Sequence, residues 1–166
     1  MASGDVSFDV VSEFDQQELV NALDQARREI TTRYDFKGAK AELELGKDEI
    51  ILRADTDFRA KQMRDLLETK ALRRALSLKI FDWGAIEEAG GNTVRQRIGL
   101  RRGLPDDLAK KITKLIRDDF PKLKSQIQGD AVRVSGKSKD ELQRLIARLR
   151  QESEGYPVPL QFQNYR

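Results

Sequence analysis

The sequence predicts an α+β fold of two ferredoxin-like (βαββαβ) sandwich domains in tandem. Two observations predict it: the second half of the chain repeats the first, and each copy orders its strand-like and helix-like patterns as β, α, β, β, α, β. Residues 47–67, KDEIILRADTDFRAKQMRDLL, align with residues 130–149, DAVRVSGKSKDELQRLIARL. In this alignment Ile50 falls on Val132, so the alternating strands coincide.

The first copy opens with the alternating strand VSFDVVSE and continues into an amphipathic helix. Ser12 or Asp15 can cap that helix, and its apolar stripe predicts Tyr34 as the last buried contact, four residues after Ile30. A hairpin around Gly46 follows, in which AELEL is the first strand. A helix over residues 57–76 and the strand LKIFDW, residues 78–83, complete the copy.

The second copy has the same order, beginning with the strand TVRQRIGL. Pro105 and the two Asp residues after it suit the first turn of a helix, and the apolar stripe of that helix ends at Phe120. Gly129 marks the hairpin turn, and Ser138 with Glu141 forms a capping box that opens the last helix. VPLQFQNY is the closing strand.

The connection between the copies predicts that they exchange their first strands. About ten turn-rich residues, GAIEEAGGNT, join residues 78–83 to the next strand, and a hairpin is the shortest way to connect them. Residues 94–101 then complete the first sheet, and the amino-terminal strand completes the second. The predicted domains are residues 12–101 and residues 1–11 plus 102–166, with a plain tandem arrangement as the alternative.

The composition excludes several classes of function. The chain contains neither Cys nor His, which removes disulfides, Cys/His metal sites and His-dependent catalytic triads. The carboxylates are scattered, so we expect no enzyme activity, no metal site and no cofactor. No apolar run approaches the roughly 20 residues of a membrane helix, and the acidic amino terminus is unlike a secretory signal, so we expect a cytoplasmic protein.

Charge is distributed unevenly along the chain. Residues 1–94 hold 14 Lys or Arg against 19 Asp or Glu, whereas residues 95–150 hold 16 against 7. A compact basic half favours a phosphate-bearing partner, although a solvated surface explains the same charges equally well.

Four motifs in order resemble the YajQ family of bacterial proteins: SFDVVSE, RYDFKG, QIQGDAVRVSGKSKDELQ and LQFQNYR. The resemblance spans nearly the whole chain. It implies paired ferredoxin-like domains with exchanged first strands and a non-catalytic, cytosolic nucleotide-binding role. Some members are described as cyclic di-GMP effectors that act with a transcription factor, and others are linked to RNA. Ala75 stands where the family commonly has Gly, which puts a positive-φ turn there in doubt.

The first candidate nucleotide site is RYDFKG. The chain has no P-loop or Rossmann glycine motif, so Arg and Lys side chains, backbone N–H groups and a stacking surface must hold any nucleotide. We expect Arg33 and Lys37 to contact phosphate or guanine acceptors and Asp35 to orient one of them. The alternative is a helix terminator, in which Gly38 supplies the turn and Phe36 folds back onto the core.

The second candidate site is in the basic half and the tail. Arg133, Lys137 and Lys139 surround the amino terminus of the last helix, where free N–H groups favour a phosphate. Ordinary helix capping and core patterning are the alternatives for this region. In the tail we expect ligand contacts from three residues: Gln161, Asn164 and Arg166.

The leading hypothesis is a nucleotide-binding protein that senses a cyclic dinucleotide or a GTP-like ligand and passes the signal to a protein partner, in the family a transcription factor. The first alternative is an RNA-binding protein that uses the basic half. The predicted third strands, DEIILRA and DAVRVSG, contain no aromatic residue to stack RNA bases, which leaves backbone binding by cations. A metal-dependent phosphohydrolase is the second alternative.

Overall fold

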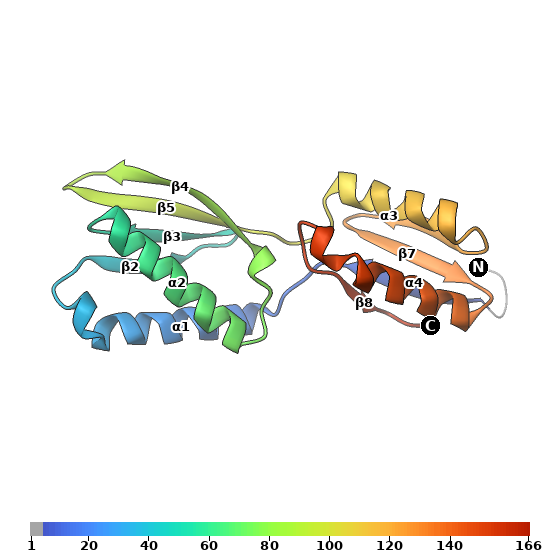
Figure 1. Cartoon of the computed structure of the whole chain (residues 1–166), viewed down its shortest axis with the longest axis horizontal. Helices are drawn as coiled ribbons and strands as arrows, with labels where there is room; N and C mark the ends of the chain where they lie inside the picture. The colour runs from blue at the N-terminus through green and yellow to red at the C-terminus, as the bar shows by residue number, and fades with distance from the viewer. Residues whose placement is uncertain (1–4) are drawn as a thin grey trace. The chain divides into compact units, whose positions relative to one another are not determined.

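The computed structural model describes residues 5–166, which form two compact units. One unit is the continuous segment Phe14–Arg101. The other combines the segment that ends at Glu13 with Arg102–Arg166. Each unit has a four-stranded antiparallel sheet and two long helices (Figure 1).

The 14–101 unit has its strands in the order β2-β3-β5-β4. Its helices α1 and α2 pack against each other, and together with the sheet they bury one apolar core. Alternate residues of β3, among them Ile50 and Leu52, face that core, whereas residues such as Arg53 point to the other face. Its elements are α1 (Gln16–Thr32), the short 3₁₀ helix η1 (Tyr34–Phe36), β2 (Ala41–Leu45), β3 (Glu49–Ala54), α2 (Asp57–Arg73), η2 (Leu78–Ile80), β4 (Phe81–Ala89) and β5 (Thr93–Leu100).

The other unit has its strands in the order β6-β7-β1-β8. Its core gathers the apolar stripes of α3 and α4 over Phe8 and Val10 of β1 and Val132 and Val134 of β7. Its elements are β1 (Val6–Val11), α3 (Asp106–Asp119), β6 (Lys124–Gln128), β7 (Ala131–Gly136), α4 (Lys139–Gln151), η3 (Ser153–Gly155) and β8 (Gln161–Gln163).

Strand pairing confirms the predicted fold class, including the exchange of first strands. β5 lies between β3 and β4, with Ile50 opposite Ile98, and so occupies the first-strand position of a sheet whose other strands come from the first copy. β1 lies between β7 and β8, with Phe8 opposite Val134 and Val10 opposite Phe162. Each unit therefore has the ferredoxin-like order with one strand from the other copy.

Side-chain caps begin α1 and α4 at the predicted places. The Asp15 carboxylate accepts hydrogen bonds from the backbone N–H groups of Gln17 and Glu18, and the Ser138 hydroxyl accepts from the N–H of Glu141. Of the two residues proposed to cap α1, Asp15 is the one that does so. These bonds satisfy N–H groups that a helix leaves unpaired at its first turn.

The structure differs from the sequence expectations in several places. Residues 78–80, expected to open a strand, form the 3₁₀ helix η2, because strand pairing in that segment begins only at Phe81. Helix α2 ends at Arg73, and only Gln161–Gln163 of the expected closing strand is strand. Tyr34 is 88% exposed and is not the last buried contact of its helix, because α1 ends at Thr32 and the backbone at Arg33 is extended. Strand β4 continues to Ala89, so most of the expected ten-residue connection is strand and only a short turn precedes Thr93. The positive-φ turn after α2 is kept, since Ala75 itself has a φ of 61°.

No helix within residues 5–166 is long and apolar enough to cross a membrane.

Candidate functional site

The RYDFKG segment is built around a buried ring. Phe36 is only 3% exposed and belongs to the core of its unit. The guanidinium groups of Arg33 and Arg59 lie over the Phe36 ring, with their central carbons 5.3 and 5.0 Å from its centroid. Gly38, with a φ of 75°, turns the chain toward β2. The ring and its two cations therefore fix the course of the loop.

The Asp35 carboxylate holds Arg33 in place. Arg33 donates from Nε and Nη2 to the two carboxylate oxygens at 3.0 and 2.7 Å, a bidentate pair that raises the pKa of the guanidinium. Arg59 donates to the backbone oxygen of Asp35, which joins the loop to the first turn of α2. The structure thus brings two of the three predicted residues together. Lys37 is exposed and takes part in no ion pair among residues 5–166.

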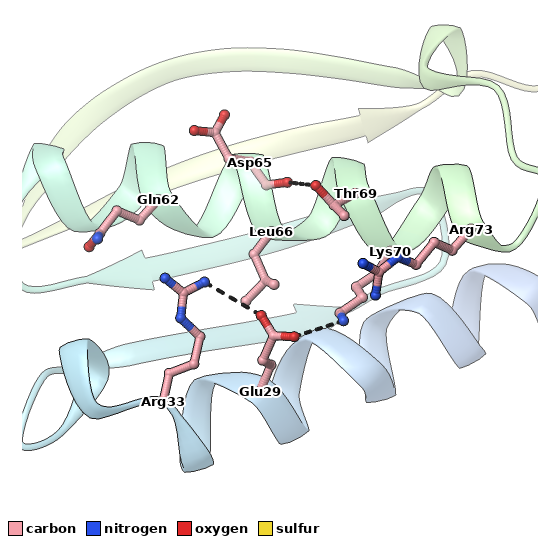
Figure 2. Close-up of a pocket in the computed structure, with 8 residues that line it drawn as sticks. All are labelled: Glu29, Arg33, Gln62, Asp65, Leu66, Thr69, Lys70 and Arg73. Carbon is pink, nitrogen blue, oxygen red and sulfur yellow. Dashed lines mark hydrogen bonds and ion pairs between the residues drawn. The ribbon is translucent and has the colours of Figure 1, made fainter.

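Beside this loop the facing sides of α1 and α2 form a groove, which we call the α1–α2 groove (Figure 2). It consists of two hollows of about 380 and 460 Å³ that share Glu29, Lys70 and Arg73. Both volumes lie within the roughly 300–1,000 Å³ of small-ligand sites. The groove is lined by Gln25, Arg28, Glu29, Thr32, Arg33, Gln62, Asp65, Leu66, Thr69, Lys70, Arg73 and Arg74.

Glu29 is an anion at the centre of the groove, and two cations already neutralise it. Lys70 Nζ donates to Glu29 Oε1 at 2.8 Å, and Arg33 Nη1 donates to Glu29 Oε2 at 3.4 Å. The hydrogen bond from Lys70 lowers the pKa of the Glu29 carboxyl, so that group stays charged. Because Lys70 is 8% exposed, this ion pair also ties α1 to α2.

Positive charge remains in excess along the groove. Its lining carries five cations against two carboxylates, and the Asp65 carboxylate points away from Glu29 in Figure 2. Arg74 pairs with Glu18 at 3.1 Å, whereas Arg28 and Arg73 form no ion pair within the described part of the chain. Arg73 lines both hollows. The groove therefore presents two uncompensated guanidinium groups, one from each helix.

In the other unit, a buried carboxylate organises two of the predicted residues. Asp9, on β1, lies opposite Arg133 of β7 and accepts hydrogen bonds from Arg133 Nε at 2.9 Å and Nη2 at 3.3 Å. The side-chain amide of Asn164 donates to the same carboxylate at 2.9 Å. The bond from Arg133 holds the pKa of Asp9 below its ordinary value. Arg133 and Asn164 are thus brought together, with Asp9 as their shared acceptor.

The remaining predicted residues lie at separate places on this unit. Lys139 and Arg166 line one hollow of about 280 Å³. Gln161 accepts a hydrogen bond from the backbone N–H of Glu13 at 2.6 Å and lies beside Phe162 and Arg150 in another hollow. Lys137 is exposed.

Sequence reasoning missed the α1–α2 groove and the role of Asp9. In the groove, 41 positions separate Lys70 from its partner Glu29. No local pattern pairs residues so far apart. Asp9 carried a usable signal, because a carboxylate between Phe8 and Val10 in an inner strand requires a partner across the sheet.

The acidic residues do not form a recognisable metal site. Within the part of the chain that the structure describes, no group of three or more carboxylates is arranged to hold a metal ion.

The comparisons with known proteins agree across nearly the whole chain. A family model described as "Nucleotide-binding protein YajQ-like" matches residues 6–166. A protein of Chloroflexus aggregans named "Nucleotide-binding protein" is 60% identical over 163 residues, which is 98% of this chain and 99% of the relative. A Trichodesmium erythraeum protein with the same name is 57% identical over 160 residues, 96% of this chain and 97% of the relative. The chain therefore belongs to the YajQ-like family of nucleotide-binding proteins.

Proposed function

We propose that this protein binds a nucleotide and that the α1–α2 groove holds its phosphates. The observation that carries the proposal is the pair of uncompensated guanidinium groups, Arg28 and Arg73, on opposite sides of a groove of small-ligand size. Phosphate oxygens are the acceptors that such groups bind most strongly, because each guanidinium offers a planar pair of donors. The names of the family and of the relatives support the same ligand class.

Arg33 is a further phosphate contact in this proposal. It lines the groove, and its pairing with Asp35 and Glu29 leaves the guanidinium oriented before the ligand arrives. Pre-orientation reduces the entropy that binding would otherwise cost. Lys37, on the same loop, contributes long-range attraction.

A guanine nucleotide suits the remaining groups of the lining. Guanine presents N7 and O6 as acceptors for Arg, and its N–H groups require an acceptor such as a carboxylate or an amide oxygen. The side-chain amide oxygen of Gln62 is such an acceptor in the lining, whereas the Asp65 carboxylate points away from Glu29 (Figure 2). Together with the motif resemblance, this supports cyclic di-GMP as the ligand and a relay of its binding to a protein partner such as a transcription factor. Binding leaves the nucleotide intact in this proposal.

Calorimetric titration of the full chain with a panel of mono- and dinucleotides tests the proposal. The double variant Arg28→Ala/Arg73→Ala should bind at least tenfold more weakly, about 1.4 kcal/mol. A matched control, Lys40→Ala/Lys47→Ala, removes two exposed cations from the same unit and should bind normally. If both variants lose the same nucleotide affinity, the loss reflects net charge and not contacts in the α1–α2 groove. Chromatography of the recovered ligand should show no turnover.

The variant Arg33→Ala/Lys37→Ala tests the sequence-predicted loop. We expect a tenfold or greater loss of nucleotide affinity with little change in melting temperature, because exposed ion pairs contribute at most about 1 kcal/mol. Normal affinity with much earlier melting would make RYDFKG a helix terminator.

RNA binding is the second candidate, and α3 supplies a specific observation for it. Lys110, Lys114 and Arg117 are exposed at helical spacing on one side of α3, and Lys122 and Lys124 follow within a few residues. A stripe of this kind fits a phosphate backbone. The variant Lys110→Ala/Lys114→Ala/Arg117→Ala should weaken RNA binding and flatten its salt dependence, measured by filter binding. If this variant binds RNA as well as the parent does, the cations of α3 are not the RNA-binding surface.

A further inference from the structure

One of the hollows in the unit that contains α4 is built from three separate segments of the chain. It has a volume of about 280 Å³, and we call it the α4 pocket. The start of β1, the first turns of α4 and the carboxyl-terminal residues all contribute to it. Its lining residues are Val6, Ser7, Lys139, Leu142, Gln143, Tyr165 and Arg166.

The aromatic wall of the α4 pocket is held in a fixed position. The Tyr165 ring stacks on the fully buried Phe8 ring, with centroids 6.0 Å apart and planes inclined by 27°. Tyr165 nevertheless stays 57% exposed, which leaves ring surface available to a ligand. The next residue, Arg166, exchanges two backbone hydrogen bonds with Ser7, of 3.0 and 3.2 Å. The ring is therefore supported by both stacking and backbone pairing.

The backbone turn at Asn164 sets the position of the Tyr165 ring. Asn164 has a φ of 58°, which lies in the left-handed region, where a non-glycine residue costs free energy. Its side-chain amide is held by Asp9, which in turn is held by Arg133. The turn at Asn164 follows directly after β8 and redirects the chain so that Tyr165 reaches the Phe8 ring. Strain that the surrounding bonds maintain in this way is common at binding sites.

The chemistry of the pocket suits a ligand with a flat apolar part and a negative charge. Val6 and Leu142 provide apolar surface beside the Tyr165 ring. Lys139 and Arg166 add two cations, and neither forms an ion pair among residues 5–166. Lys139 is the first residue of α4, at the end of the helix where the backbone dipole also favours an anion.

We propose that the α4 pocket binds a small aromatic anion of the nucleoside monophosphate class. The base stacks on Tyr165, and the phosphate is held between Lys139 and Arg166. Stacking on an aromatic side chain is a general way to hold a base, because every base has a π face. This site belongs to a different unit from the α1–α2 groove, and its existence does not depend on the function proposed there.

Amide chemical shifts of the ¹⁵N-labelled full chain, titrated with GMP, test the proposal. Signals of Val6, Leu142 and Gln143 should shift saturably. Guanosine, which lacks the phosphate, and ribose 5-phosphate, which lacks the base, should each bind at least tenfold more weakly than GMP. The variant Arg28→Ala/Arg73→Ala should leave these shifts unchanged, so failure of the groove and failure of the pocket give different results.

Two pairs of variants make the test specific. Lys139→Ala should weaken GMP binding at the pocket at least tenfold, whereas Lys137→Ala removes an exposed cation outside the lining and should have no effect. Tyr165→Ala should weaken GMP binding at the pocket, whereas Tyr165→Phe should bind GMP as the parent does, because stacking requires the ring and not the hydroxyl. The proposal is overturned if GMP moves none of the pocket signals, or if Lys137→Ala and Lys139→Ala weaken binding equally.

Discussion

At the scale of single residues, Phe36 is the anchor of the RYDFKG loop. Its ring is buried in the core and covered by two guanidinium groups, so Phe36→Ala removes apolar contacts and leaves a cavity. We expect a loss of about 3 kcal/mol in the free energy of unfolding, measured by urea denaturation. The neighbouring variant Tyr34→Ala removes an exposed ring and should change stability by no more than about 0.5 kcal/mol. A larger effect of Tyr34→Ala would contradict this assignment.

Asp9 should make stability depend on pH in acid. Its pKa in the folded protein is lowered below the ordinary 3.8 by the Arg133 hydrogen bond, so its contribution is complete above about pH 4. That contribution is lost as the pH falls through the lowered pKa. Asp9→Asn should therefore be less stable than the parent at neutral pH, and the difference should narrow in acid. Urea unfolding measured from pH 7 down to pH 2 checks this prediction.

The control for Asp9 is Asp48→Asn, which alters an exposed carboxylate that forms no ion pair within residues 5–166. Its stability should run parallel to that of the parent at every pH. Arg133→Ala leaves Asp9 buried without its main partner, so we expect that variant to lose stability whether or not Arg133 also contacts a ligand.

Three residues show where prediction from sequence was limited: Tyr34, Arg133 and Asn164. Helical spacing assigned Tyr34 to the core, but the spacing applies only while the helix continues, and the extended backbone at Arg33 gives Phe36 the buried position instead. Arg133 was predicted as a ligand contact from its position near the start of the last helix, and Asn164 from its position in the tail. Their common acceptor is Asp9, and 155 positions separate it from Asn164, so the pairing becomes visible only in the folded sheet.

At the scale of elements, the turn that ends α2 is strained, because Ala75 has a left-handed backbone conformation that a glycine would adopt more easily. Leu76 N–H donates to the Ala71 carbonyl and Ala75 N–H to the Leu72 carbonyl, a Schellman motif that usually places Gly where Ala75 stands. Ala75→Gly relieves the left-handed conformation, partly offset by the greater freedom of Gly in the unfolded chain. We expect a net stabilisation of about 0.5–1 kcal/mol, measured by thermal and urea unfolding.

The matched control is Ala147→Gly, in an exposed position inside α4. The same replacement there should destabilise by about 1 kcal/mol, because Gly is a poor helix former. Loss of stability in both variants would mean that the turn at Ala75 imposes no strain.

Most elements could be predicted from the sequence, because capping residues and alternation act locally. Asp15 and Ser138 identify the starts of α1 and α4, and the period of two identifies β3 and β7. The extension of β4 to Ala89 could not be predicted. That segment is polar and turn-like, and it is a strand because β5 pairs with it beyond an irregularity between Trp83 and Ile86.

At the scale of the whole molecule, the exchange of strands determines which fragments can fold. In residues 1–93 the position of β5 between β3 and β4 is empty, which leaves unpaired backbone groups and an open apolar face. Residues 12–101 contain that strand. We expect residues 12–101 to unfold cooperatively and residues 1–93 not to, as measured by circular dichroism and urea denaturation. The opposite result would reject residues 12–101 as a folding domain.

The position of strand β1 in the chain also determines the order in which the two units can fold during translation. Val6–Val11 is translated before the whole 14–101 unit, yet its neighbours in the sheet, β7 and β8, are translated after α3. The 14–101 unit can close as soon as Leu100 has left the exit tunnel, while Phe8 and Val10 still lack a partner strand. At translation rates of roughly 5–20 residues per second, this waiting period lasts several seconds. The nascent strand β1 is therefore an apolar segment that chaperones can bind until β7 and β8 have been made.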